Sequence, residues 1–319
     1  MTVSQTSPAD AGMADQGRTT KRRLQNRRNL IGFLMALPPI IVLVLFVGLP
    51  VVLAILFSFG YTGGLNQVSA QIGQHVHAGT PFTVAAYGDI ISDPRFVRDL
   101  WVTLLITVVS TLFVLVFTVG IAVYARLTRS KVGTLLTSMA IIPLFIPVVI
   151  ASWANLTFYS SNGFIRSLFA QFHVEGPTLG FTTAGVIIAS IWVNLPFATL
   201  MVTSGIEGIP DALIESARDA GASTMRIVCE ILIPLAKVPI LIASTFTAIG
   251  VLGQFTVPYF TGPNAPSMLG VDISKYFQSF NQPQQSVAIA CVIFVFAIGI
   301  AVAYIKVSVG DSGKKEGER

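Results

Sequence analysis

Charged residues are scarce in this chain of 319 residues. Asp, Glu, Lys and Arg together make up 11% of the sequence, whereas soluble domains average about 25%. Hydrophobic residue types make up 53%, and the mean hydropathy is +0.74. These proportions exclude an ordinary soluble globular domain, and they predict an all-α protein whose helices cross a membrane several times.

Cysteine and histidine, which many metal and redox sites need, are also rare. The two cysteines are Cys229, in a central polar segment, and Cys291, in the last apolar run, and we expect no disulfide between them. His75 and His77 lack further ligands at metal-site spacing and His173 is isolated, so we assign none of them a role.

Groupings of residues typical of catalysis are missing as well. We find no paired carboxylates in a plausible pocket and no Ser-His-Asp pattern, and the one fragment like a phosphate loop, Gly310 to Lys314, has the wrong spacing. We therefore expect no catalytic residue, no metal, no cofactor and no ATP site. The apolar runs also lack the ionisable residues that ion-coupled transporters place within the membrane.

Six apolar runs are long enough to span a bilayer, which needs about 20 residues. They are Leu30 to Phe59, Leu100 to Ala125, Gly133 to Phe158, Phe181 to Ile206, Ala236 to Phe260 and Val287 to Ile305. We expect a bundle of six transmembrane helices over residues 30–306, preceded by a disordered basic tail, 1–29, and followed by a second tail, 307–319. The first run is too long for a signal-peptide core of roughly 7 to 15 residues and is taken as a retained span.

Lysine and arginine fix the expected orientation. If the N-terminus lies in the cytoplasm, 16 of the 20 basic residues fall in or beside cytoplasmic segments. We therefore expect a multi-pass protein of the bacterial inner membrane with both termini in the cytoplasm. The basic residues surround apolar runs and do not gather on a soluble face, so the net charge of +5 indicates membrane topology and no nucleic-acid partner.

The most polar internal segment, 208–235, lies between the fourth and fifth runs. Pro210 suits the start of a helix, and Asp211 and Glu215 suit its positive end. Gly221 is a natural turning point, so the segment predicts two short helices joined there at the membrane surface. From the residues alone, an interfacial helix with solvated charges explains this segment about as well as a docking site for a partner.

The run Glu215-Ser216-Ala217-Arg218-Asp219-Ala220-Gly221-Ala222, followed by Ile233-Pro234-Leu235, resembles the "EAA" loop of permease subunits of binding-protein-dependent ABC importers. Ser216 and Ile233 are mild departures from the alanine and leucine usual in that family. The resemblance implies that 208–235 is a cytoplasmic coupling helix and loop that dock on the ATPase subunit. The docking residues would be Asp211, Glu215, Ser216, Ala217, Asp219 and Gly221.

The resemblance also implies partners: two cytoplasmic ATP-binding subunits, a second permease subunit that we expect to be a homologue, an external solute-binding protein and membrane lipid. ATP hydrolysis would belong to the partners, so this chain would be a transport subunit and not an enzyme. A non-transporting membrane scaffold or sensor subunit is the alternative of a different class.

Uncharged polar residues within the runs are candidates for lining a translocation pathway. They are Asn155, Asn194, Thr199, Ser244, Thr245 and Gln254. Each would serve equally in a hydrogen bond between helices. Prolines within runs three to five, at positions 143, 147, 196 and 258, predict interrupted helices around a cavity.

For the solute class, Arg218-Asp219-Ala220-Gly221-Ala222 and Phe255 to Tyr259 resemble polyamine-type permeases. Thr261 to Asn264 and Tyr276 to Phe280 resemble the sugar type. The first resemblance leads us to expect a polyamine-like solute, with a carbohydrate as the alternative.

Overall fold

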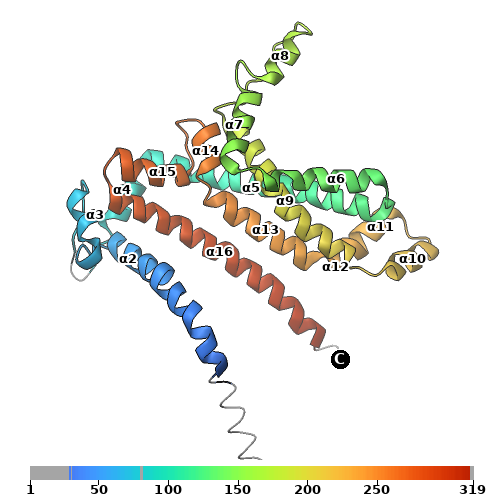
Figure 1. Ribbon diagram of the computed structural model, residues 1–319, viewed down its shortest axis with the longest axis horizontal. Helices are drawn as coiled ribbons and strands as arrows, with labels where there is room; N and C mark the ends of the chain where they lie inside the picture. The colour runs from blue at the N-terminus through green and yellow to red at the C-terminus, as the bar shows by residue number, and fades with distance from the viewer. Residues whose placement is uncertain (1–28, 30, 80–81, 317–319) are drawn as a thin grey trace, which may run out of the picture. The chain divides into compact units, whose positions relative to one another are not determined.

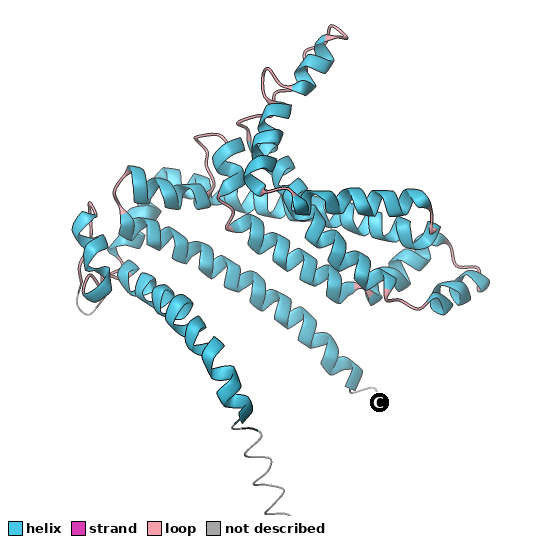
Figure 2. Cartoon of the chain, viewed as in Figure 1, coloured by secondary structure: helices cyan, strands magenta, loops and turns pink. Residues whose placement is uncertain are grey.

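The computed structural model describes residues 29, 31–79 and 82–316, and the expected tail 1–29 lies almost wholly outside them. The described residues fold into helices joined by turns and loops, with no strand among them (Figure 2). This confirms the all-α membrane fold class. The chain divides into two compact units, 1–56 and 57–319.

The first unit contains a single apolar helix within its described part. The helix runs over Ile31–Ser58, so its last residues belong to the second unit, and it includes the π-helical turn η1 (Val44–Gly48) and α2 (Leu49–Ser58). Its side chains are almost all exposed in the isolated chain. An apolar helix with this exposure suits a lipid environment.

Three further helices are long and apolar enough to cross a membrane: α5 (Pro94–Thr128), α9 (Thr183–Glu207) and Pro283–Ser308 of α16 (Pro283–Glu316). Two bent helix pairs raise the number of spans among the described residues to as many as six, if each pair is one span. The count of six therefore stays a prediction.

The first bent pair lies where the sequence predicts a proline break. Helix α6 (Lys131–Ile141) and the 3-10 turn η3 (Ile142–Phe145) are bent by 111° from α7 (Val148–Tyr159) and α8 (Phe164–Ala170), and Pro143 and Pro147 flank the bend. Proline lacks the donor that a continuing helix needs. Pro196, by contrast, is accommodated inside the uninterrupted α9.

The second bent pair begins in the central polar segment. It joins α11 (Thr224–Ile227), η4 (Val228–Leu232) and α12 (Ile233–Leu235) to α13 (Lys237–Leu252) at an angle of 70°. The expected fifth span, Ala236 to Phe260, is itself interrupted, because α13 ends before Gly253 and α14 (Thr256–Thr261) is a separate short helix.

The core of the second unit is the contact of α5 with α9 and α13 (Figure 1). Small side chains allow close approach. A Cβ on Gly205 of α9 would lie 2.4 Å from the ring of Pro239 in α13. Buried Ala122, Val202 and Ala243 belong to the same apolar cluster. Glycine and alanine are the residues that typically permit close helix packing in membranes.

A second layer forms at the Pro94 end of α5, from segments that lie between the apolar runs of the sequence. Residues 60–99 contain η2 (Gly64–Asn66), α3 (Gln67–Ile72) and α4 (Ala85–Ser92), and residues 261–283 contain α15 (Leu269–Ser274) and η5 (Lys275–Ser279). Leu269 and Val271 are buried there. Residues 269–274 thus form a helix with a buried face between the fifth and sixth apolar runs.

Two buried glutamines at the start of α16 hold this layer together. Gln284 donates to the carbonyls of Phe57 and His77 and accepts from the His77 amide, at 2.7 to 3.0 Å. Gln285 donates to the His75 carbonyl and to Asp89. These bonds satisfy backbone groups of a segment without regular structure, which burial requires.

Candidate functional site

The central polar segment forms two short helices, as expected. Helix α10 covers Asp211–Asp219 and α11 begins at Thr224, capped by the Ser223 side chain. Gly221 between them has φ +79°, a conformation that favours glycine. Pro210 precedes α10 as its N-cap residue and does not occupy the first turn.

Helix α10 is amphipathic, with one face directed at the core. Ile214 is buried, and Ala217 is half-buried against the same apolar cluster as Leu127 of α5. Glu215, Ser216 and Asp219 are exposed. The exposed face of α10 therefore carries carboxylates and small side chains, and no other described part of the chain covers it.

Asp211 behaves differently from the other acidic residues of α10, because arginines at the end of α5 bind it. Its carboxylate lies 2.7 Å from Arg126 and also contacts Arg129. Arg126 is 10% exposed and donates a second bond to the carbonyl of Ile209. One guanidinium thus binds groups on both sides of Pro210 and fixes where α10 begins.

The arginines also change the ionisation of this site. The hydrogen bond from Arg129, followed by that from Arg126, lowers the pKa of Asp211, and the same contact raises the pKa of Arg129. Asp211 therefore stays charged throughout the physiological pH range, and the contact between α5 and α10 persists with it.

A polar cluster lies at the interruption between α13 and α14. Ser190 of α9 donates to the side-chain carbonyl of Gln254 at 2.8 Å, and the Asn194 amide donates to the Ser190 carbonyl at 2.8 Å. A Cβ on Gly250 would lie 3.3 Å from the Asn194 side chain. The structure thus brings two candidate pathway residues, Asn194 and Gln254, to one place, together with Ser190, which sequence reasoning missed.

The other candidate pathway residues bond within their own helices. Thr199 donates to the Leu195 carbonyl, and Ser244 and Thr245 both donate to the Leu241 carbonyl. The Asn155 amide lies 3.5 Å from the Ala151 carbonyl. Such bonds to the preceding turn are common for polar residues in helices and do not themselves indicate a solute site.

Exposed aromatic rings adjoin the polar cluster. Phe255 and Tyr259 stack with ring centroids 5.0 Å apart, and Tyr259 is 56% exposed. Phe260 contacts both Tyr259 and Trp153. Aromatic faces next to uncharged hydrogen-bonding groups form a surface suited to a ligand with both apolar and polar faces.

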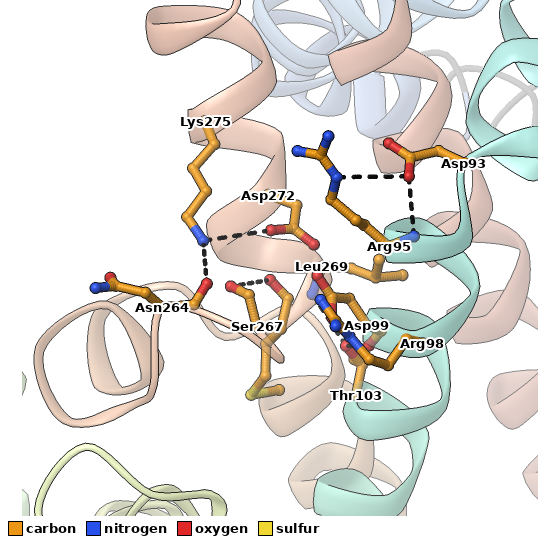
Figure 3. Close-up of polar contacts among 11 residues, drawn as sticks. Asp93, Arg95, Arg98, Asp99, Thr103, Asn264, Ser267, Leu269, Asp272 and Lys275 are labelled. Carbon is orange, nitrogen blue, oxygen red and sulfur yellow. Dashed lines mark hydrogen bonds and ion pairs between the residues drawn. The ribbon is translucent and has the colours of Figure 1, made fainter.

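A carboxylate pair lies near the Pro94 end of α5, and the expectation that the chain has none was wrong (Figure 3). Asp99 of α5 and Asp272 of α15 are 5% and 6% exposed and line the same cavity. Arg98 lies 3.2 Å from Asp99, and Lys275 lies 3.7 Å from Asp272. A cavity of about 190 Å³ adjoins the pair.

Sequence reasoning missed this pair for an identifiable reason. The second apolar run was delimited at Leu100, but α5 begins at Pro94 and includes Asp99. Asp272 lies between the fifth and sixth apolar runs, outside every segment expected to span the membrane. Aspartate in the apolar sequence Met268 to Ile273 was the available signal, because charged residues in such a setting are usually paired.

The histidines stay without an assigned role in metal binding. His77 lies 2.7 Å from the Asp89 carboxylate, and no group of three or more His, Cys, Asp or Glu side chains within the described residues could hold a metal ion. The contact of His77 with Asp89 instead helps to position the segment that Gln285 also binds.

Burial, and then the neighbouring Asp99, raise the pKa of Asp272 to about 7. Lys275 and Ser267 act in the opposite direction. The folded state therefore favours the neutral carboxyl, and stability should fall as pH rises from about 4, the usual aspartate value, toward 7.

We expect the thermal midpoint of the purified chain in detergent to fall between pH 5 and 8 by more than that of Asp272→Asn, because asparagine carries no charge to bury. Unfolding of both proteins, followed by intrinsic fluorescence, measures the difference. Asp219→Asn, at an exposed position, is the matched control. Parallel pH profiles for the chain and Asp272→Asn would contradict the assignment.

Comparisons with known proteins agree with this geometry. Residues 90–309 match the model of the family "binding-protein-dependent transport system inner membrane component". The matched region extends from α4 to α16 and includes both the central polar segment, 208–235, and the polar cluster around Gln254.

Two relatives of this chain are named as transporters of different solutes. The chain is 30% identical over 231 residues to the trehalose transport system permease protein SugA of Mycobacterium tuberculosis, covering 69% of this chain and 72% of SugA. It is 28% identical over 237 residues to the spermidine/putrescine transport system permease protein PotB of Salmonella typhimurium, covering 74% and 79%.

Solved structures resemble the fold. A chain in the crystal structure of a bacterial alginate ABC transporter, in complex with an alginate pentasaccharide-bound periplasmic protein, matches with a TM-score of 0.70 at 18% identity, covering 87% of this chain and 93% of that one. Because the family model matches most of this chain, the chain belongs to the inner-membrane components of binding-protein-dependent ABC transport systems.

Proposed function

We propose that this chain is the permease subunit through which an ATP-driven importer receives mechanical work from cytoplasmic ATPase subunits. The observation that carries the proposal is α10, which is anchored to α5 through Asp211 and Ile214 while Glu215, Ser216 and Asp219 stay exposed. A helix held on one face and open on the other can transmit the movement of a docked partner.

The docking surface comprises the exposed residues of α10, with Ala217 at its edge and Gly221 turning the chain into α11. Asp211 belongs to the same segment but is bound within the chain, so it positions the helix. Carboxylates on an exposed helix suit a partner groove that offers Arg or Lys. The partners would be two ATP-binding subunits, a second permease subunit homologous to this one, and an external binding protein that delivers the solute.

The distribution of Lys and Arg supports an orientation with both termini and α10 in the cytoplasm of a bacterium. In that orientation the Thr128 end of α5 is cytoplasmic, and the layer of α4, α15 and η5 faces outward. The solute then crosses the inner membrane between this subunit and its companion.

We place the solute beside the interruption between α13 and α14. Gln254 and Asn194 are uncharged, and the adjacent Phe255 and Tyr259 rings are exposed. Neutral hydrogen-bonding groups beside aromatic faces suit a polyhydroxylated solute, and the similarity to a trehalose permease points the same way. A carbohydrate is therefore our first candidate for the solute.

A polyamine is the second candidate, on two specific observations. The Arg218 to Ala222 motif resembles polyamine permeases, and the chain is similar to PotB. The Asp99 and Asp272 carboxylates add no third observation, because both are buried and lie close to Arg98 and Lys275.

Glu215→Lys should abolish both co-purification of the ATPase subunit and ATP-dependent uptake, because the new ammonium group would repel the Arg or Lys of the proposed partner groove. Pull-down of the ATPase with the tagged permease and uptake in a complemented deletion strain measure the two effects. Glu175→Lys, an exposed position in the loop after α8, is the matched control.

Survival of both docking and uptake in Glu215→Lys would overturn the coupling role of α10. If Glu215→Lys loses docking but the parent chain itself restores no solute uptake to the deletion strain, the result would instead support a scaffold or sensor subunit.

Uptake assays with labelled trehalose and maltose, compared with putrescine and spermidine, should show transport of the saccharides. Gln254→Ala should reduce that uptake by up to about tenfold, because a lost hydrogen bond of about 1.4 kcal/mol corresponds to that factor. Thr137→Val, which removes a bond within α6, should leave uptake unchanged. Uptake of the amines alone would reject the carbohydrate and favour the second candidate.

A further inference from the structure

Helix α5 is bound by polar contacts at both of its ends, and its middle is continuous. It has 35 residues and no proline beyond Pro94 at its start. At 1.5 Å per residue it extends about 50 Å, longer than the roughly 30 Å hydrocarbon core of a bilayer. Its two ends therefore lie on opposite sides of the membrane.

The inner contact of α5 consists of Arg126, Ile209 and Asp211. Helix α9 is joined to α10 by the chain itself, but Gly208, Ile209 and Pro210 between them lie outside the helices. A non-helical connection leaves the angle of α10 open to change. Arg126 binds the Ile209 carbonyl and the Asp211 carboxylate, so it ties both ends of this connection to α5.

The outer contact of α5 consists of Thr103, Met268 and Leu269. The Thr103 hydroxyl donates to the Asp99 carbonyl at 2.7 Å and accepts from the Leu269 amide at 2.9 Å. All three residues of the contact are almost fully buried. Met268 packs in one cluster with Ile106 of α5, and Leu269 packs in another with Phe96 of α5.

Gly270, which follows the outer contact in the sequence, lies directly against the polar cluster around Gln254. A Cβ on Gly270 would lie 2.4 Å from the Gln254 carbonyl oxygen and 3.5 Å from that of Gly253. Helix α15 therefore approaches the interrupted backbone between α13 and α14 with no side chain between them. Any displacement of α15 along α5 would press on or release the peptide of Gln254.

We propose that α5 carries the movement of α10 across the membrane to the Gln254 segment, with Arg126 and Thr103 as the positioning residues at its two ends. This inference rests on the proposed coupling role of α10 and adds the path by which that role reaches the solute. Rigid secondary structure with defined polar contacts at each end is the kind of element that can couple distant sites.

The test uses the complete importer in proteoliposomes: this chain, the companion permease, the ATPase and the loaded binding protein. Cys229 and Cys291 are replaced by serine, and Ser267→Cys, a buried position beside the outer contact, reports on α15. The measured quantity is the rate of reaction with a membrane-impermeant maleimide, with and without ATP.

ATP should change the reaction rate at position 267 by at least about fivefold, the lower end of typical coupling between sites. Arg126→Gln should remove this change while the ATPase still co-purifies. Arg226→Gln is the matched control, because Arg226 is exposed in the same cytoplasmic segment and pairs only with Glu230 within the described residues. A full ATP response in Arg126→Gln, or no response in the parent, would overturn the proposal.

Thr103→Val tests the outer contact independently of the stability of Arg126 variants. It keeps the side-chain shape but leaves the Leu269 amide without its acceptor. Stimulation of ATP hydrolysis by the loaded binding protein should be lost while basal hydrolysis is retained, and retained stimulation would overturn the proposal. If Glu215→Lys abolishes docking but both α5 variants behave like the parent, only this inference fails; if Glu215→Lys transports normally, the proposed function fails.

Discussion

The contact of Arg126 with the Ile209 carbonyl and the Asp211 carboxylate is the interaction on which the rest of this account depends. Helix α10 has only nine residues and one buried side chain, Ile214, so little else determines its position. Helices this short are marginal in isolation. Arg126 is nearly buried while Asp211 is half-exposed, so the guanidinium relies on the Ile209 carbonyl and the Asp211 carboxylate for its hydrogen bonds. Helix α10 is thereby made an extension of α5 and not an independent loop.

The interruptions elsewhere in the bundle complement the continuity of α5. Pro143 and Pro147 bend one span, and the segment between α13 and α14 opens another. Backbone groups freed by such breaks need partners within the protein or in a water-filled cavity. Ser190 and Asn194 provide polar groups at the second break, and Gly270 lets α15 reach its backbone. The bundle thus combines a continuous helix with broken ones, which is the arrangement that the proposed movement of α5 requires.

The composition, prolines and glycines of the sequence predicted the helical class, the break at Pro143 and Pro147 and the turn at Gly221. These features depend on local properties of the chain. Contacts between distant residues could not be predicted: Arg126 and Asp211 are separated by the whole of α9, and Thr103 meets Leu269 across 166 positions. The same limit explains why Ser190 and the Asp99–Asp272 pair were missed. Polar residues in apolar segments mark such contacts without identifying the partner.

The central claim is that α10 and the turn after it face the cytoplasm, where an ATPase can bind. Cys229 is exposed in η4 of this segment, whereas Cys291 is half-buried in α16, so a Cys291→Ser chain carries one accessible thiol. The most direct measurement is labelling of that thiol with a membrane-impermeant maleimide in intact spheroplasts and in inverted vesicles. The account predicts labelling in inverted vesicles only. Labelling of Cys229 in intact spheroplasts would place the segment outside the cell and would contradict the account.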